Sequence, residues 1–376
     1  MMMEIEVVDL NSPKKLAQFI QFPFRLYKDC EQWVPPFIGD MRVMLDRKKH
    51  PFHEHSDVEF FIAKKNGEIV GRVAAIENKP YNQYHQTRQA SFYFFECVDD
   101  QEVANKLFER VFDWMASRGL NKLVGPKGLG PLDGYGILVK GFEHRPMMTM
   151  MNYNYPYYPV LLERLGFVKE VDFVSAYVHR SKFRMPEKVH QIAARVLERG
   201  TFQVIDFKNK RDLRAWADKI GQAYNRAFVN NWEYYPLSDR EIKFVTDSIL
   251  AVADPHLIKI ILKNNEVVGF LFAFPDISAA LQRQKGKITP WGILDFLLEM
   301  RRTKWVAMNG GGVLPEYHGR GGNALLYSIM EKTAQNYHFE HIDMTQVAET
   351  AVQMRKDLET LGGEFYKNHR VYAKEI

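Results

Sequence analysis

The hydrophobic and polar positions of this chain follow two periods, which predict two kinds of element. Apolar residues at every second position, or in short runs between turn residues, predict strands, and apolar residues three and four apart predict helices. In the first half, helices are predicted over 12–30 and 101–118, and strands over 59–64, 68–77, 90–98, 121–125 and 168–178. In the second half, helices are predicted over 187–199, 210–229, 238–252, 323–337 and 348–361, and strands over 202–207, 257–263, 266–275, 304–313, 340–346 and 364–373. The mixture predicts an α/β (α+β) protein with hairpin-rich sheets.

An internal repeat predicts two related domains. The segment beginning Lys65-Asn-Gly-Glu-Ile-Val-Gly recurs 198 residues later, beginning at Lys263, with Asn-Asn at the turn. Leu162-Glu-Arg-Leu-Gly recurs 196 residues later, beginning at Leu358. A repeat of this length indicates duplicated domains rather than a solenoid. The polar stretch 180–188 is the best linker, so we predict domains at 1–184 and 185–376.

Composition narrows the class of protein. Two cysteines, Cys30 and Cys97, exclude a disulfide framework or a cysteine-based zinc site and are typical of a reducing compartment. The net charge of +5 is mild and no dense basic run occurs, so nucleic acid is not an expected partner. The N-terminus lacks the pattern of a signal peptide, and no apolar stretch is as long as a membrane span. We expect a cytoplasmic protein, either free or peripheral to the inner membrane.

A glycine-rich turn is the clearest chemical feature. His318-Gly-Arg-Gly-Gly-Asn-Ala324 follows a predicted strand and opens a predicted helix, for which Asn323 would be the N-cap. Such a turn aims backbone N–H groups and a helix N-terminus at one point, which favours a phosphate or pyrophosphate. An ordinary strand–helix connection is the alternative. The candidate contacts are Val313, Leu314, His318, Gly319, Arg320, Gly321, Gly322, Asn323 and Ala324.

The turn and the repeat together resemble the GNAT superfamily of N-acyltransferases, in tandem. In that superfamily an Arg/Gln-x-x-Gly-x-Gly/Ala motif holds the pyrophosphate of acyl-CoA. Here Gly321 matches, while His318 and Asn323 depart from the motif. The resemblance implies two GNAT-like domains, each with a mixed, mostly antiparallel sheet flanked by helices, and acetyl-CoA or a longer acyl-CoA as co-substrate. In the first domain Asp99-Asp-Gln-Glu102 replaces the glycine turn and would repel a pyrophosphate, so only the second is expected to bind CoA.

A narrower resemblance concerns segments of the first half. Trp33 to Pro36, His50 to Phe52, Phe95 to Cys97 and Tyr153 to Tyr158 are similar to signatures of a bacterial GNAT-like family. That family is associated with lipid N-acylation, including bacterial ceramide synthase. The resemblance therefore implies an amine-bearing lipid, such as a sphingoid base, as acceptor.

Candidate catalytic groups are few. The superfamily often uses a tyrosine in the helix after the fifth strand, and that position carries Leu358 here. Asp343 on the fifth-strand pattern and Glu349 near the following helix are the nearest carboxylates. Each could equally be a solvated charge or a helix-start carboxylate favoured by the helix dipole.

Two segments could serve a lipid substrate. The Met- and Tyr-rich segment 147–158 follows a glycine-rich loop and offers Asn152, Asn154, Tyr157 and Tyr158 as substrate contacts, or else fills a core. Apolar residues of the insert 285–304 stand beside Lys and Arg, which suits a membrane-interface helix, although most such helices pack on the body of the protein. His50, His53 and His55 are too loosely spaced for a metal site, and no metal is expected.

The sequence predicts an acyl-CoA-dependent N-acyltransferase that acts on the amine of a lipid. Three alternatives remain: a small-molecule N-acetyltransferase, a Fem-type transferase that uses aminoacyl-tRNA, and a non-catalytic acyl-CoA-binding protein. A Fem-type enzyme would carry a longer helical arm and a more basic surface.

Overall fold

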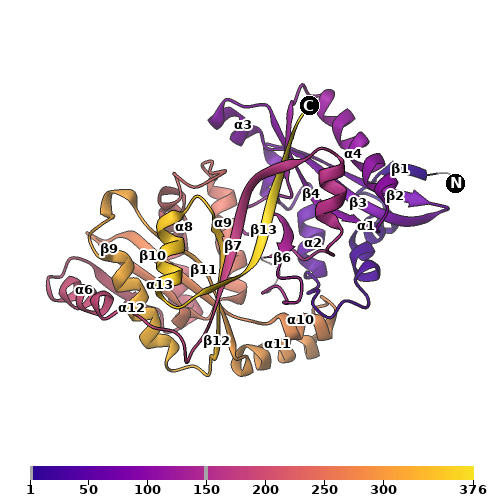
Figure 1. Ribbon diagram of the computed structural model, residues 1–376. Helices are drawn as coiled ribbons and strands as arrows, with labels where there is room; N and C mark the ends of the chain where they lie inside the picture. Colours follow the sequence, from indigo (N-terminus) through magenta and orange to yellow (C-terminus); the bar gives the residue numbers. More distant parts are fainter. Residues whose placement is uncertain (1–2, 148–150) are drawn as a thin grey trace. The chain divides into compact units, whose positions relative to one another are not determined.

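The computed structural model describes residues 3–147 and 151–376, which form two compact units. The first unit consists of residues 1–174, 278–296 and 367–376, and the second of residues 175–277 and 297–366. Three elements contribute residues to both units (Figure 1): β7 (Val168–His179), α11 (Pro290–Arg302) and β13 (Glu364–Glu375).

The first unit contains a mixed sheet in which β4 and β5 are parallel and the other pairs are antiparallel. Its strand order is β1-β2-β3-β4-β5-β13, with β6 also paired to β13. Its other elements are β1 (Met3–Val7), α1 (Pro13–Leu26), α2 (Ile38–Leu45), η1 (Pro51–Glu54), β2 (Asp57–Lys65), β3 (Glu68–Glu77), α3 (Lys79–His85), β4 (Gln89–Cys97), α4 (Gln101–Ala116), β5 (Lys122–Gly125), β6 (Ile137–Lys140), α5 (Tyr158–Arg164) and α10 (Ser278–Gln284).

Helices cover both faces of this sheet. Phe108 of α4 packs against Phe92 in one core cluster, and Phe19 of α1 packs near Phe94 in the other. Phe92 and Phe94 belong to the same strand and would share a face under strict alternation. A bulge with a positive φ of 52° at Phe94 breaks the alternation and sends the two rings to opposite faces.

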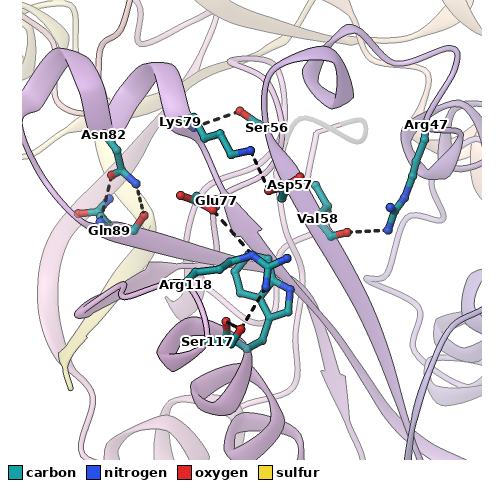
Figure 2. A network of polar contacts seen from close by, with 11 residues as sticks. Arg47, Ser56, Asp57, Val58, Glu77, Lys79, Asn82, Gln89, Ser117 and Arg118 are labelled. Atoms are coloured by element: carbon teal, nitrogen blue, oxygen red, sulfur yellow. Dashed lines mark hydrogen bonds and ion pairs between the residues drawn. The ribbon is translucent and has the colours of Figure 1, made fainter.

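Polar contacts fix the ends of the helices in the first unit to its strands. Figure 2 shows Lys79 at the start of α3, where its backbone N–H donates to Ser56 Oγ at 3.2 Å and its ammonium lies 2.9 Å from Asp57. Asn82 pairs with the backbone of Gln89 through both ends of its amide. These contacts hold α3 against the strands that it connects.

The second unit has the strand order β7-β12-β11-β10-β9-β8. β11 and β12 are parallel, and the pairs β8–β9, β9–β10 and β10–β11 are antiparallel. Its other elements are α6 (Glu187–Glu198), β8 (Gln203–Asp206), α7 (Lys210–Ala215), α8 (Ala217–Ala227), α9 (Asp239–Val252), η2 (Pro255–Leu257), β9 (Ile258–Lys263), β10 (Glu266–Pro275), β11 (Trp305–Val313), η3 (Pro315–Tyr317), α12 (Gly322–Ala334), β12 (His341–Ala348) and α13 (Val352–Thr360).

The two faces of the second sheet are covered by different helices. Leu325 of α12 and Val196 of α6 share a buried cluster with Leu271 of β10. On the other face Tyr224 of α8 stacks on the ring of Phe270, with ring centroids 6.1 Å apart. Adjacent residues of β10 thus point to opposite helix layers, as strand geometry requires.

The predicted fold class is confirmed: each unit has a mixed, mostly antiparallel sheet flanked by helices. The helix predicted over 210–229 is two helices, because the backbone at Trp216 ends α7 and starts α8. β1, α2 and α3 were not predicted.

The predicted domains and the compact units divide the chain differently. Residues 278–296 and 367–376 belong to the first unit although they lie in the predicted second domain, and 175–184 belong to the second unit. For 367–376 the cause is strand pairing, since this end of β13 pairs with β5 and β6. The assignment of a CoA loop to 185–376 and of a degenerate domain to 1–184 stays a prediction.

Candidate functional site

The glycine turn starts from a firmly anchored strand end. Val313 and Leu314 are buried, and the N–H of Leu314 donates to Val268 O at 2.9 Å. The imidazole Nε2 of His318 lies 2.7 Å from Val313 O, so His318 closes the loop onto the end of β11. Gly319 and Gly321 have positive φ angles of 73° and 84°, which favour glycine.

The N-terminus of α12 lies directly after this turn. The helix starts at Gly322 with Gly321 as its N-cap, so the predicted N-cap Asn323 is wrong: Asn323 lies in the first helical turn and is exposed. The first N–H groups of a helix have no acceptor within the helix, and the helix dipole favours an anion there. Arg320 is exposed beside this helix end, with its guanidinium 5.4 Å from the ring centroid of Tyr317. Ala324 is in the same turn of the helix.

Two glycines of the turn serve packing. A Cβ at Gly321 would lie 2.7 Å from Val196 Cγ2, and one at Gly322 would lie 3.1 Å from Ile261 Cδ1. Gly321 therefore lets α12 approach α6, and Gly322 lets it approach the sheet. A Cβ at Gly319, in contrast, would meet nothing within 4 Å.

The strands before and after α12 are paired over only part of their length. β11 and β12 pair from Trp305 and His341 to Met308 and Met344, and this parallel register does not continue to the ends of the strands. β11 also carries a bulge against β10, where Gly310 has a φ of 101°. The ends of β11 and β12 nearest the glycine turn thus lie beyond the positions at which these two strands pair.

Of the two predicted carboxylates, Asp343 is buried near the last paired positions of β11 and β12. It pairs with Ala307 across β11 and β12, one residue before the last paired position. Met344 packs with Leu358 of α13, so the neighbouring Asp343 points to the opposite face of the sheet. Asp343 is 0% exposed, and its Oδ2 accepts a hydrogen bond of 2.7 Å from the hydroxyl of Tyr366. Glu349 lies in the turn between β12 and α13 and is partly exposed.

Tyr366 is a residue that the sequence did not single out. Burial, followed by the nearby Asp343 carboxylate, raises the pKa of its phenol far above the ordinary value. Tyr366 therefore keeps its proton at neutral pH and acts as a donor. Its position on β13, 23 residues from Asp343, gave no local signal of the contact.

An aromatic group adjoins this pair in the second unit. Tyr177 has its ring centroid 5.8 Å from that of Tyr366, and its hydroxyl lies 2.9 Å from His341 Nδ1. His341 in turn stacks on Trp305 with ring centroids 4.4 Å apart. Burial, with a smaller contribution from the charge of His179, lowers the pKa of His341, which favours a neutral imidazole.

The corresponding place in the first unit holds carboxylates. β4 and β5 are parallel there as well, and α4 follows β4. The side chain of Asp100 caps α4 by accepting from Glu102 N at 2.9 Å, and it pairs with Lys65 at 2.8 Å. The cap of α4 is thus a carboxylate, whereas the N-cap of α12 is Gly321, which has no side chain. This agrees with the prediction that the first half binds no CoA, which stays a prediction.

The four predicted substrate contacts bond to the first unit itself. Asn152 donates to the carbonyls of Gly134 and Gly136, and Asn154 bonds both backbone groups of Leu138. The hydroxyls of Tyr157 and Tyr158 bond Cys97 O at 2.7 Å and Glu96 Oε2 at 2.7 Å. These bonds support a structural role, and substrate contact stays a prediction. Residues 148–150 of the Met- and Tyr-rich segment lie outside the described residues.

Glu96, in one of the segments that carried the narrower resemblance, is bonded by Tyr158 of another. Its Oε2 accepts from Tyr27 at 2.6 Å and from Tyr158 at 2.7 Å, and Arg72 Nη2 lies 3.9 Å from its Oε1. Trp33 stacks on Tyr27 with ring centroids 5.2 Å apart. Burial raises the pKa of Glu96, and the charge of Arg72 opposes that shift.

The three histidines near residue 50 bond within the protein. His53 Nε2 lies 2.9 Å from Met44 O, His55 Nδ1 lies 2.7 Å from Ser56 Oγ, and His50 Nδ1 accepts from Phe52 N. Within residues 3–147 and 151–376, no group of three or more His, Cys, Asp or Glu side chains is placed to hold a metal ion. In the same residues no helix is both long and apolar enough to cross a membrane.

Comparison with known proteins supports the resemblance over the whole length. No family model matches the chain. The chain is 27% identical to Protein YghO of Escherichia coli (strain K12), across 96% of this chain and 93% of that protein. It is also 27% identical to bacterial ceramide synthase of Caulobacter vibrioides (strain NA1000 / CB15N), across 99% and 98% of the two chains. A solved tandem GNAT protein from the clavulanic acid biosynthesis pathway, without AcCoA, matches 100% of this chain and 98% of its own with a TM-score of 0.56 and 10% identity. The resemblance to the GNAT superfamily is thus confirmed, and the chain has the fold of a tandem GNAT protein.

Proposed function

We propose that this protein is an acyl-CoA-dependent N-acyltransferase. One observation carries the proposal: the glycine turn and the N-terminus of α12 follow the end of β11, beyond the last position at which β11 pairs with β12. A CoA pyrophosphate suits the helix end, where Arg320 adds positive charge. The pantetheine arm, an extended chain with two amides, would lie along β11 and β12 beyond their last paired positions. Val313, Leu314 and His318 would act by fixing the loop rather than by direct contact.

The proposed chemistry uses Tyr366 and Asp343. A neutral amine attacks the thioester carbonyl, the new C–N bond forms, and the C–S bond breaks as the thiolate leaves. Since Asp343 is 0% exposed, a bulky amine cannot reach it directly. We therefore route the amine proton through the half-buried hydroxyl of Tyr366 to Asp343.

The acceptor is proposed to be the amine of an amphipathic lipid. Support comes from the similarity, at 27% identity, to an enzyme that carries the name bacterial ceramide synthase. A small-molecule N-acetyltransferase or a non-catalytic acyl-CoA-binding protein would use the same glycine turn. The Fem-type alternative has no feature in the described residues that favours it over these.

The helix α11 supports contact with a membrane surface. Trp291 is 80% exposed, and Ile288, Ile293 and Leu294 are each 49% exposed or more. Its Asp295 carboxylate is bonded by Arg283 of α10 at 2.7 Å, which partly neutralises this negative charge. Lys285, Lys287, Arg301 and Arg302 flank these residues, which suits an anionic lipid surface.

A charge at the helix end tests the CoA site. Asn323→Asp adds a carboxylate in the first turn of α12, which the helix dipole tolerates but which repels a pyrophosphate. Calorimetry should show CoA affinity reduced about tenfold or more, because like charges about 4 Å apart near a protein surface repel by up to about 4 kcal/mol and about 1.4 kcal/mol is a factor of ten. The affinity for pantetheine, which lacks the phosphates, should be unchanged. If the affinities for CoA and pantetheine fall equally, or if neither affinity changes, CoA does not bind at this helix end.

A further inference from the structure

The acylation of a charged amine leaves one proton that the site must release to water. At neutral pH an aliphatic amine is an ammonium, since its pKa lies near that of lysine, about 10.4. Its nitrogen loses two protons on becoming an amide, and the CoA thiolate takes up only one of them. Asp343, which receives the amine proton in the proposed function, is 0% exposed and cannot release it to water directly. Another group must therefore carry this surplus proton away.

His341 lies on the same face of the second sheet as Asp343. The two residues are two positions apart on β12, and strand alternation gives them one face. The hydroxyl of Tyr177, on β7, lies 2.9 Å from His341 Nδ1. The ring of Tyr177 also adjoins that of Tyr366, whose hydroxyl bonds Asp343. These contacts, all within the second unit, lead from the buried carboxylate to the imidazole.

The imidazole of His341 suits the outer end of this route. It is partly exposed, and its ring stacks on that of Trp305. The titratable and charged groups around it, besides Tyr177, are His179 on β7 and the ion pair of Lys304 with Glu340, 2.9 Å long. Burial, and then the charge of His179, lowers the pKa of His341 from its ordinary value. His341 is therefore neutral at pH 7 and can accept a proton.

Tyr177 suits the inner part of the route. Burial raises the pKa of its phenol, so Tyr177 stays protonated at neutral pH. A protonated phenol accepts one hydrogen bond while it donates another, so it can pass a proton on without a lasting charge. Tyr366 also keeps its proton, and its ring centroid lies 5.8 Å from that of Tyr177.

We infer that Tyr177 and His341 carry the surplus proton of each turnover from Asp343 to water. The inference rests on the proposed function, because the proton comes from the amine that the enzyme acylates. One N–H bond of the ammonium breaks, and the Asp343 carboxylate gains the proton through Tyr366. The proton then passes through the hydroxyls of Tyr366 and Tyr177 to Nδ1 of His341, and the imidazolium loses its Nε2 proton to water. Asp343 is again a carboxylate, and the amine, now neutral, attacks the thioester.

The test measures kcat/KM from pH 7 to pH 10 for wild type, His341→Gln and Tyr177→Phe, with acetyl-CoA and palmitoyl-CoA as donors and sphinganine and dodecylamine as acceptors. At pH 7 both variants should lose about a hundredfold, the lower range for loss of a proton-transfer group. The loss should shrink toward pH 10, because more of the amine then arrives neutral and brings no surplus proton. Imidazole added to His341→Ala, which leaves room for it, should restore part of the rate at pH 7.

His179→Gln is the matched control. The rings of His179 and His341 have centroids 5.3 Å apart, but the Nδ1 of His179 lies 2.7 Å from Ser181 Oγ rather than at Tyr177. This variant should keep the wild-type rate from pH 7 to pH 10. Circular dichroism and the calorimetric affinity for CoA check that each variant is folded. Since His341→Gln and Tyr177→Phe interrupt the same route, either one carries the test if the other fails to fold.

The outcomes separate this inference from the proposed function. If wild type acylates neither amine from either donor, the proposed function fails and this inference fails with it. If wild type is active and a folded His341→Gln or Tyr177→Phe keeps its rate at pH 7, the route is wrong although the function stands. A loss that is equal at pH 7 and pH 10, with no rescue by imidazole, would show a structural role and would also overturn the inference.

Discussion

Single hydrogen bonds assign roles to the titratable residues of both units. The carboxylate of Asp343 is fully buried and is bonded by the hydroxyl of Tyr366. The imidazole of His369 is 1% exposed, and its Nε2 lies 2.9 Å from Asn152 O. In each case a hydrogen bond to one atom determines which proton the residue can bind or transfer, and each role can be tested by a measurement.

Tyr366→Phe should lower kcat by about a hundredfold, the lower range for loss of a proton-transfer group. KM for acyl-CoA should change little, since the phenol carries no part of the CoA site. Asp343→Asn should give a similar loss of kcat, whereas Glu349→Gln, in the partly exposed turn after β12, should leave kcat unchanged. Steady-state kinetics with circular dichroism as a folding check would decide. A Tyr366→Phe enzyme with wild-type kcat would remove Tyr366 from the mechanism.

His369 should make the folded state sensitive to mild acid. Burial lowers its pKa from 6.5 to about 4, and its Nδ1 is buried with no hydrogen-bond partner among the described residues. Between pH 6.5 and about 4 the unfolded chain therefore binds the extra proton, so stability is full above pH 6.5 and falls as the pH falls. The loss should approach about 3 kcal/mol. Urea unfolding at pH 7 and pH 4.5 should show a smaller loss for His369→Gln, and an equal loss would contradict the assignment.

For single residues, the sequence identified some side chains of the candidate site but not the side chains that bond to them. Asp343 could be found because it is a carboxylate on the predicted fifth strand, near the position where the superfamily resemblance places the catalytic group. Tyr366 could not, because its contact depends on which strands become neighbours in the sheet. Asn152 and Asn154 were predicted as substrate contacts because they are polar residues in the Met- and Tyr-rich segment. The structure shows instead that their side-chain amides bond to backbone groups of the protein.

Elements were predicted well where periodicity alone decides them. The strand predicted over 266–275 is β10, and the helix predicted over 238–252 begins one residue later as α9 after a capping box at Ser238. Caps and breaks were less predictable. Asn323 has the chemistry of an N-cap, but Gly321 can adopt the left-handed conformation that the turn requires.

Gly321→Ala should cost more stability than Gly319→Ala. Both residues have positive φ, so both substitutions introduce backbone strain. Only the Cβ at 321 also collides, at 2.7 Å from Val196 Cγ2 and 2.9 Å from Ile192 Cγ2, which adds about 1–3 kcal/mol of overpacking. Chemical denaturation of the two variants measures the difference. Equal free energies of unfolding would show that α6 moves away without cost.

The helix α11 should determine binding to membranes. Trp291→Asp places a negative charge among the apolar side chains that α11 exposes. The variant should bind anionic vesicles about tenfold or more weakly in co-sedimentation, because it loses an interfacial aromatic side chain and its new charge is repelled by the anionic lipids. Tyr84→Asp is the control, since Tyr84 is also exposed, at 48%, but lies on α3. Vesicle binding that is equally strong for wild type and Trp291→Asp would exclude α11 as the contact.

For the molecule as a whole, the sequence showed the repeat, but it did not show which segments join which compact unit. The repeat at offsets of 198 and 196 residues predicted two related domains. Nothing in a linear pattern shows that the last ten residues belong to the first compact unit. That result depends on β13 pairing with β5 and β6, which are more than 220 residues earlier in the chain.

Because the compact units do not match the predicted domains, we expect that neither predicted domain folds alone. A fragment of residues 185–376 lacks residues 175–184 of the second unit and carries 278–296 and 367–376 without the rest of the first. Val371, Tyr372 and Ala373 are each at most 4% exposed in the full chain and would lose the strands that cover them. We expect this fragment to aggregate or to melt without a cooperative transition.

A chain shortened to residues 1–366 should likewise have a less stable first unit, because Arg370 no longer bonds Asp172 at 2.8 Å and β5 loses a neighbouring strand. A synthetic peptide of residues 364–376 should restore its cooperative melting in calorimetry. A fragment 185–376 that is soluble, melts cooperatively and binds CoA would show that the second domain folds independently.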